Sequence, residues 1–298
     1  MLKASDIRGF LWAVLIAAGL GALLLWRVGG HRGRPPAPPG PPPAVARRTG
    51  CAAPAWRSAA AQNGASLANL AWAPFGPPET GWATYAPLVA HEAGTPCPPD
   101  SPGFAQAYAA WQAQEKLPAD GIFKPEDFRV MRAALMLRRP FVLATTAGAC
   151  PAAPDPATLA NADAAEAYGG KAVQLRPGAL AAYRSLVAAA RAAGLARQPP
   201  RLALVSGFRG PGEEALRCAD GGCNTLTRAH CSAHRTGLAL DLYLDPLPGA
   251  DPTSTAEANR RHMTETPEYR WLVSNAARFG FLPYPYEPWH WEWTGEAP

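Results

Sequence analysis

Residues 232–244 read SAHRTGLALDLYL, and this stretch carries the clearest structural pattern in the C-terminal part of the chain. Its last seven residues alternate, so that four leucines share one face of an expected strand and Ala239, Asp241 and Tyr243 share the other. Gly237 permits the tight turn that leads into this strand. Asp241 is a carboxylate beside an apolar face, and such a group needs a metal, a cation or hydrogen bonds as its partner.

Helix and strand patterns on both sides of this stretch predict an α+β domain with an antiparallel sheet and flanking helices. The expected elements are a helix from Pro177 to Gly194, a strand over 201–206, a helix capped by Thr266 that ends at Gly280, and a strand over 288–293. The last strand places its three tryptophans on one face and His290 with Glu292 on the other. We expect the tryptophans in the core rather than on a sugar-stacking surface.

Several residues of metal-binding type surround these two strands. His234 and Asp241 lie in the first stretch, and Glu287 and His290 lie at the start of the last strand. Two histidines and one carboxylate form a common zinc set that leaves one position open for water, and a further carboxylate can take a proton from that water. Spacing alone leaves two explanations open: a metal site, or a structural histidine with Asp241 paired to an arginine.

Three sequence motifs occur in a defined order along the chain. The pattern S-G-[FY]-R is met at 206–209, S-x-H-x-x-G-x-A-x-D at 232–241, and E-x-W-H at 287–290. Together they resemble the VanY-type D-alanyl-D-alanine carboxypeptidases, a family of zinc peptidases that trim the stem peptides of peptidoglycan. The resemblance covers roughly residues 140–293.

The resemblance implies a zinc centre and a general base. His234, Asp241 and His290 would be the ligands of Zn²⁺, and Glu287 would take the proton of the attacking water. Glu292 lies on the same strand face as His290 and is the alternative base.

The resemblance also implies residues that contact the substrate. Arg209 would bind the substrate or stabilise the oxyanion, and we expect Ser232 and Arg235 in the substrate-binding site as well. An arginine is suited to a free terminal carboxylate because its planar fork can donate two hydrogen bonds. The alternative for Arg209 is an internal pair with Glu213 or Glu214.

The implied function is zinc-dependent hydrolysis of D-alanyl-D-alanine in peptidoglycan stem peptides. Many relatives have serine and glutamine where this chain has Gly210 and Glu214, which leaves the fine substrate specificity open. The alternatives are an endopeptidase of the same family and a non-catalytic protein that binds the cell wall. The retained base Glu287 argues against the last of these.

A helical region precedes the expected catalytic domain. FAQAYAAWQAQ at 104–114 has aromatic residues at helical spacing, LPADGIF at 117–123 contains a turn signal, and a second helix begins at Pro125. This arrangement resembles the small three-helix peptidoglycan-binding module. The alternative is a plain helical hairpin that packs on the catalytic domain.

The N-terminal part is expected to anchor the chain in a membrane. Residues 10–26 carry no charge and form a short membrane span, and residues 35–43 (PPAPPGPPP) form an extended spacer. A cleaved signal peptide is the alternative, but the small-residue triplet at 44–46 lies too far from the apolar run. We therefore predict an anchor at 1–30, a linker at 31–56, a helical module at 57–139 and a peptidase domain at 140–298.

Cysteines and charge bear on the compartment and the partners. Six cysteines suggest disulfides outside the cytoplasm, with 15 complete pairings possible; a metal site made by Cys218, Cys223 and Cys231 with His230 is the alternative. The net charge is +5, but no long basic run accompanies it, so nucleic acid is not expected as a partner. The cysteines and the implied substrate favour a single-pass protein of the cytoplasmic (inner) membrane whose catalytic domain lies in the periplasm or cell-wall space. The arginines that follow the span favour the opposite orientation, with this domain in the cytoplasm.

Overall fold

The computed structural model describes residues 50–298 except 146–147, 199, 220–222, 224–225 and 227–230. Residues 45–298 belong to one compact unit. The predicted membrane span at 10–26 and the proline-rich segment lie outside the described residues. Among the helices that are described, none is long and apolar enough to cross a bilayer.

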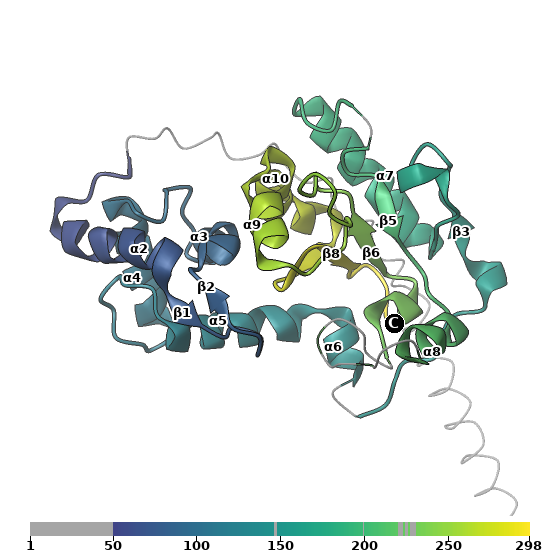
Figure 1. The fold of residues 1–298 in the computed structure, drawn as a ribbon, viewed down its shortest axis with the longest axis horizontal. Helices are drawn as coiled ribbons and strands as arrows, with labels where there is room; N and C mark the ends of the chain where they lie inside the picture. The colour runs from purple at the N-terminus through teal and green to yellow at the C-terminus, as the bar shows by residue number, and fades with distance from the viewer. Residues whose placement is uncertain (1–49, 146–147, 199, 220–222, 224–225, 227–230) are drawn as a thin grey trace, which may run out of the picture. The chain divides into compact units, whose positions relative to one another are not determined.

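A four-stranded antiparallel sheet forms the centre of the C-terminal part (Figure 1). Its strands are β5 (Leu204–Ser206), β6 (Ala239–Leu242), β7 (Phe281–Tyr284) and β8 (Glu287–Trp293), in the order β5-β6-β8-β7. Two pairings matter for the site: Asp241 of β6 lies opposite His290 of β8, and also opposite Ser206 of β5. The sheet therefore brings together residues that are far apart in the sequence.

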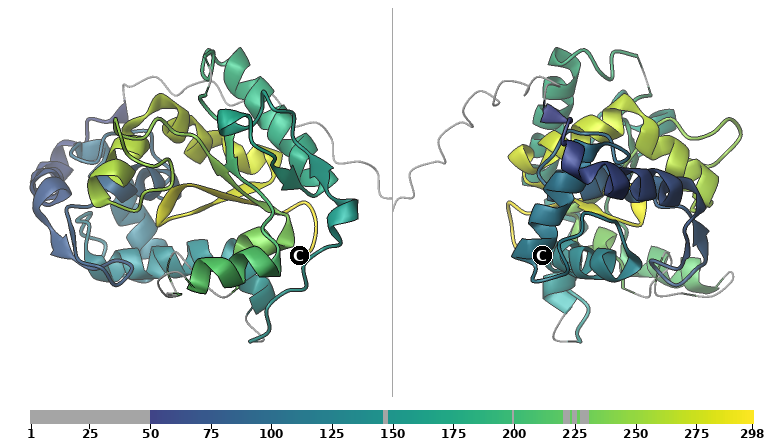
Figure 2. Two further views of the ribbon diagram at one scale, coloured as in Figure 1. Left: turned by 45° about the vertical axis from the view of Figure 1, so that its right-hand side comes forward. Right: turned by 90° about the vertical axis from the view of Figure 1, so that its left-hand side faces the viewer.

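Helices cover the leucine face of this sheet (Figure 2). They are α7 (Pro177–Ala192), α9 (Glu257–Glu265) and α10 (Pro267–Asn275). The four leucines of the 232–244 stretch are all fully buried, and Trp289 and Trp291 lie in the same core. The predicted apolar face and the predicted core tryptophans are confirmed, and so are the α+β class and the antiparallel sheet.

Two predicted strands are longer than the observed ones. Leu202 adopts a positive φ of 60° within the stretch expected as a strand over 201–206, and β5 begins only at Leu204; β6 covers 239–242 of the expected 238–244. Such φ values are uncommon outside glycine and are not encoded by the alternating pattern. The predicted helix that ends at Gly280 is also divided, because α10 is followed by a 3₁₀ turn at Ala276–Phe279.

The N-terminal part of the compact unit is mainly helical. Its elements are α2 (Arg57–Asn69), the hairpin of β1 (Ala71–Trp72) and β2 (Glu79–Thr80), α3 (Ala86–Glu92), α4 (Pro102–Gln114) and α5 (Pro125–Arg138). Short elements connect it to the sheet and complete the fold: α6 (Pro140–Thr145), β3 (Ala160–Asn161), β4 (Gln174–Leu175) and α8 (Pro211–Ala219).

The LPADGIF loop between α4 and α5 is held by two buried amide side chains. Asn63 donates to the carbonyl of Gly121 and accepts from the amide of Phe123, at 2.9 and 2.8 Å. Gln112 accepts from the amide of Gly121 at 2.8 Å and donates to Asp127 at 2.8 Å. The backbone of the loop is therefore satisfied inside the helical region.

The helical region also packs against the C-terminal part that contains the four-stranded sheet. Arg260 of α9 forms a buried ion pair with Glu79 of β2 at 2.8 Å, and the rings of Phe75 and Tyr286 pack in a tilted arrangement with their centroids 5.1 Å apart. A helical hairpin that packs on the catalytic domain was one of the two alternatives for this region. Its glycan-binding role and the boundary between 139 and 140 stay predictions.

All six cysteines form disulfides: Cys51–Cys97, Cys150–Cys231 and Cys218–Cys223. The predicted use of the cysteines as disulfides is confirmed. The alternative of a metal site made by Cys218, Cys223 and Cys231 is wrong, because none of these thiols remains free.

Candidate metal centre and active site

Three side chains meet on the face of the sheet opposite the leucines. His234, Asp241 and His290 are all buried, and their potential ligand atoms lie within 4.8 Å of one another. One oxygen of Asp241 is 3.2 Å from Nε2 of His234, and the other is 3.0 Å from Nδ1 of His290. The structure thus brings together the three residues that the sequence predicts as metal ligands.

Local sequence fixes the turn that carries His234. This residue lies in a 3₁₀ turn (Ala233–Thr236), where the Ser232 hydroxyl accepts the His234 amide at 3.3 Å. The turn ends at Gly237, whose φ of 70° favours glycine and whose added Cβ would lie 3.1 Å from Leu159. The spacing of His234 to Gly237 in the motif therefore reflects the geometry of a turn into β6.

The upstream motif supports the same histidine through its backbone. The ring Nδ1 of His234 lies 2.6 Å from the carbonyl oxygen of Gly207. This contact assigns the proton to Nδ1 and leaves Nε2, the atom that faces Asp241, without one. A side chain at position 207 would collide with the backbone of Gln174, so only glycine fits there. Sequence reasoning missed this role of Gly207, although the motif contains it.

The second histidine has a carboxylate behind it. His290 turns Nδ1 toward Asp241, and its buried Nε2 lies 3.4 Å from Oε1 of Glu292, which is an ion-pair contact rather than a formed hydrogen bond. Glu292 also accepts from Arg139 Nε at 2.7 Å and from the Phe141 amide at 3.1 Å. The position of Glu292 on the His290 face was visible in the sequence, but its contact with Arg139 was not.

The electrostatics of the cluster suit a cation. Burial, with a contribution from Arg209, lowers the pKa of His234 to about 4. Burial opposes ionisation of Asp241, but the two histidines hold its pKa well below the usual value. Burial also opposes charging of His290, yet Asp241 and Glu292 raise its pKa to about 9. Zinc takes neutral imidazole nitrogens and ionised carboxylates, so His234 and Asp241 are already in the metal-binding form, whereas His290 must release a proton when a metal binds. With that proton released, this donor set fits a divalent metal ion.

The two candidate bases have opposite environments. Glu287 begins β8, is half-buried and lines a cleft with Asp241 and Arg209. Burial is the main cause that raises the pKa of Glu287 to about 7. Glu292 is 1% exposed, and although burial opposes its charge, Arg139 and His290 lower its pKa to about 2. Only Glu287 combines access to the cleft with a pKa near neutrality, which favours it over Glu292 as the base.

The cleft beside the cluster has a volume of about 840 Å³ and is lined by polar groups. Arg209 donates from Nη2 to the Ser232 hydroxyl at 3.2 Å, and within the described part of the chain its buried Nε has no hydrogen-bond partner. Glu213 accepts from the Gly210 amide instead. Arg209 thus lines the cleft and forms no ion pair with an acidic residue in the described part of the chain, and its substrate-binding role stays a prediction.

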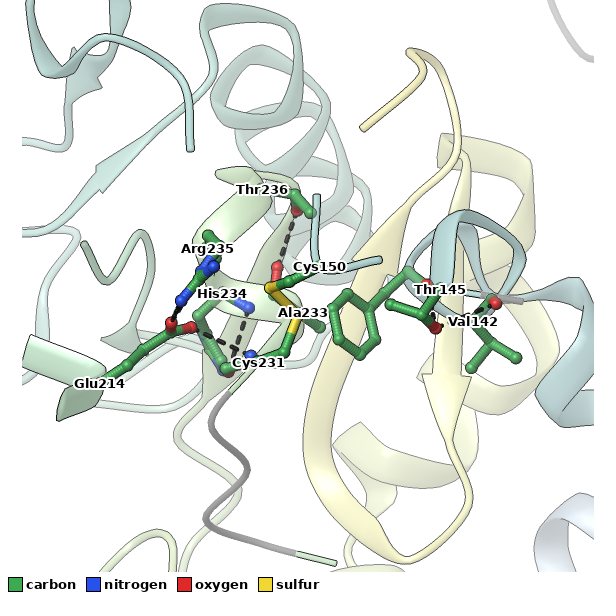
Figure 3. The surroundings of a disulfide bond; sticks show 11 residues. Val142, Thr145, Cys150, Glu214, Cys231, Ala233, His234, Arg235 and Thr236 are labelled. Carbon is green, nitrogen blue, oxygen red and sulfur yellow. Dashed lines mark hydrogen bonds and ion pairs between the residues drawn. A yellow bond between two sulfur atoms is a disulfide. The ribbon is translucent and has the colours of Figure 1, made fainter. Parts of the chain in front are cut away.

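Arg235 has an internal partner. It forms an ion pair with Glu214, which is 3% exposed and also accepts the Ser232 amide at 3.0 Å (Figure 3). This contact accounts for Glu214 at the position where many relatives are expected to have glutamine. Its carboxylate holds the turn between Ser232 and Arg235. The substrate-binding role of Arg235 stays a prediction.

The Cys150–Cys231 disulfide lies directly beside this turn (Figure 3). Cys231 precedes Ser232 in the chain, and its partner is 81 residues upstream. The ligand turn is thus held by a covalent bond, by the Glu214 carboxylate and by the Ser232 hydroxyl.

A family model matches part of the chain. No curated protein matches the chain. The match to a family model begins downstream of Arg209 but includes the three candidate ligands and Glu287. Residues 224–296 match the family described as VanY, D-alanyl-D-alanine carboxypeptidase, which confirms the resemblance over the part of the chain that carries the candidate metal centre.

Proposed function

We propose that this protein is a zinc-dependent carboxypeptidase that removes the terminal D-alanine from peptidoglycan stem peptides. One observation carries the proposal: His234, Asp241 and His290 converge beside a cleft whose wall includes the half-buried Glu287. The family match over residues 224–296 supports a peptidase that acts on D-alanyl-D-alanine.

The metal ligands and Glu287 would have different roles in the hydrolysis. A Zn²⁺ ion held by His234, Asp241 and His290 would polarise the scissile carbonyl and make water more acidic. Glu287 accepts a proton from the attacking water and returns it to the leaving amine, for which a pKa near 7 is suited. Burial of the cluster excludes bulk water and so strengthens the charges that act there.

Arg209 supports the carboxypeptidase over the endopeptidase. A carboxypeptidase must bind a free terminal carboxylate, and an endopeptidase must not require one. Arg209 lines the cleft, and no acidic residue in the described part of the chain forms a hydrogen bond with it. Its guanidinium is therefore available for a carboxylate of the substrate.

The location is part of the proposal. We infer that residues 10–26 anchor the protein in the cytoplasmic membrane and that the catalytic domain lies outside, next to the peptidoglycan. The three disulfides support an oxidising compartment. A reporter that is active only in the cytoplasm, fused after Pro298, should be inactive; an active reporter would contradict this orientation.

The reaction can be tested with two substrates. The purified protein should release D-alanine from a stem pentapeptide with a free C-terminus and act far less on the same peptide amidated at its C-terminus, as measured by mass spectrometry. A chelator should stop the reaction and Zn²⁺ should restore it. Equal cleavage of both peptides would favour the endopeptidase, and full activity without any metal would contradict the whole proposal.

A further inference from the structure

Arg139 and Glu292 form a buried ion pair that lies against the metal centre. Arg139 follows the last residue of α5 and is 5% exposed, and Glu292 on β8 is 1% exposed. The guanidinium donates from Nε to Oε1 of Glu292 at 2.7 Å and packs 4.1 Å from the centroid of the Tyr284 ring. The other carboxylate oxygen accepts the amide of Phe141 at 3.1 Å. Glu292 is therefore fixed from two sides.

The proton on His290 connects this pair to the ligands. An imidazole binds a metal through the nitrogen that lacks a proton, so its other nitrogen carries the proton and needs an acceptor when buried. Nδ1 of His290 faces Asp241 at 3.0 Å, which leaves the buried Nε2 to carry the proton. Oε1 of Glu292 lies 3.4 Å from Nε2 on that side and would accept this hydrogen when the ring binds a metal.

The same arrangement occurs at the other histidine with a different acceptor. Nδ1 of His234 faces the carbonyl oxygen of Gly207 at 2.6 Å, and Nε2 faces Asp241. Each candidate ligand thus directs one nitrogen to Asp241 and the other to an oxygen held by the fold. A carbonyl is neutral, whereas Glu292 adds a second buried negative charge near Asp241. Arg139 supplies the positive charge that allows this carboxylate to stay there.

We infer that Glu292 and Arg139 are positioning residues for the metal ligand His290. Glu292 selects the imidazole form that offers Nδ1 to the metal, and Arg139 holds Glu292 in place from the end of α5. The helical region would then complete the metal centre rather than act only as a separate wall-binding module. This inference rests on the proposed zinc site.

The competing explanation is a purely structural ion pair that joins α5 to the sheet. Loss of a buried pair destabilises a protein whether or not it supports a ligand. The two explanations differ in metal affinity: second-sphere partners of metal ligands typically change it about 10- to 100-fold. A structural pair would change only the folding stability.

The test uses Glu292→Gln and Arg139→Met, with Arg138→Met as the matched control. Arg138 is the neighbouring arginine, but it pairs with Glu92 at the surface. Zn²⁺ dissociation constants are measured by titration against a competing chelator, and melting temperatures are measured for the metal-free proteins. We expect both test variants to bind Zn²⁺ about 10- to 100-fold more weakly and the control to stay within about twofold of the original protein.

A spectroscopic measurement provides a second readout. In the zinc-loaded protein, ¹⁵N chemical shifts of His290 should show a proton on Nε2, and Co²⁺ substitution should give an absorption spectrum that changes in Glu292→Gln. If Arg139→Met does not fold, Arg139→Lys retains the charge without the fork and should show a smaller loss of zinc affinity.

The outcomes separate this inference from the proposed function. Test variants with lower melting temperatures but unchanged zinc affinity would overturn the positioning role and leave the peptidase intact. A proton found on Nδ1 of His290 would also overturn it. If the original protein binds no Zn²⁺, the proposed function itself fails.

Discussion

Two buried polar clusters in this protein have opposite chemistry. In the helical region, Asn63 and Gln112 make hydrogen bonds with the LPADGIF loop and with Asp127 through both their donors and their acceptors. In the metal centre, Asp241 lies between two histidines, and Nε2 of His290 has no formed hydrogen bond. The first cluster is complete without a ligand, while the second collects donor atoms that suit a cation. Burial of polar groups alone does not identify a functional site; the convergence of several potential metal-binding atoms does.

Among changes to the two clusters, we expect His234→Ala in the metal centre to have the largest effect on zinc binding and hydrolysis. This change removes one of the three candidate ligands, so we expect loss of bound zinc and of hydrolysis, with the secondary structure unchanged. Metal analysis, peptide hydrolysis and circular dichroism measure the three properties. His91→Ala, which changes an exposed histidine on α3, is the control and should leave all three unchanged. Full zinc content in His234→Ala would contradict the assignment.

The next effect separates metal binding from catalysis within the second cluster. Glu287→Gln retains the size of the side chain but removes the proton acceptor, so zinc should stay bound while turnover falls by about a hundredfold or more. Steady-state kinetics and metal analysis on the same sample measure both. If Glu287→Gln is active and Glu292→Gln binds zinc normally but is inactive, then Glu292 is the base and our assignment is wrong.

A change in the first cluster should affect stability only. Asn63→Ala leaves the Phe123 amide and the Gly121 carbonyl buried without their partner, which should cost about 1–3 kcal/mol of the free energy of unfolding. Zinc affinity should stay the same. Denaturant unfolding measures the cost, with exposed Gln62→Ala as the control. A loss of zinc affinity in Asn63→Ala would remove the distinction between the two clusters.

The smallest effect concerns the pH dependence of stability. The pKa of Glu287 is raised in the folded protein to about 7 from 4.5, so ionisation favours the unfolded state and the metal-free protein loses stability as pH rises from about 4.5 to 7. Glu287→Gln has no such loss. Its melting temperature should equal that of the original protein near pH 4 and exceed it by a few degrees near pH 8, in metal-free samples. A difference in melting temperature that does not vary with pH would show that the fold does not raise the pKa of Glu287. The exposed residue change Glu265→Gln serves as the control.

Local features of the fold were predictable from the sequence. The leucine alternation placed Asp241 on the correct face, and Thr266 caps α10 as expected, since its hydroxyl accepts the Tyr269 amide. Pro177 and Gly280 lie at the expected helix and turn ends. These signals act over a few residues, so one sequence contains them.

Features that depend on distant contacts were not predictable. The disulfide pairing, the positive φ of Leu202 and the contact of Arg139 with Glu292 all depend on how separate segments meet. The sequence gives no spacing rule for an arginine and a glutamate 153 residues apart. The metal set itself was suggested by its motif, but its electrostatics depend on burial that only the fold defines.

If the protein is a peptidase that is exported as we propose, the Cys150–Cys231 disulfide would link its maturation to export. Thiols stay reduced in the cytosol and pair in oxidising compartments, and this bond restrains the residue next to the turn that carries His234. For a protein exported as we propose, the turn gains its covalent restraint only after translocation. A newly synthesised chain would then reach full competence beside the wall polymer, and the soluble peptidoglycan precursors that a cell builds internally would be spared from premature trimming.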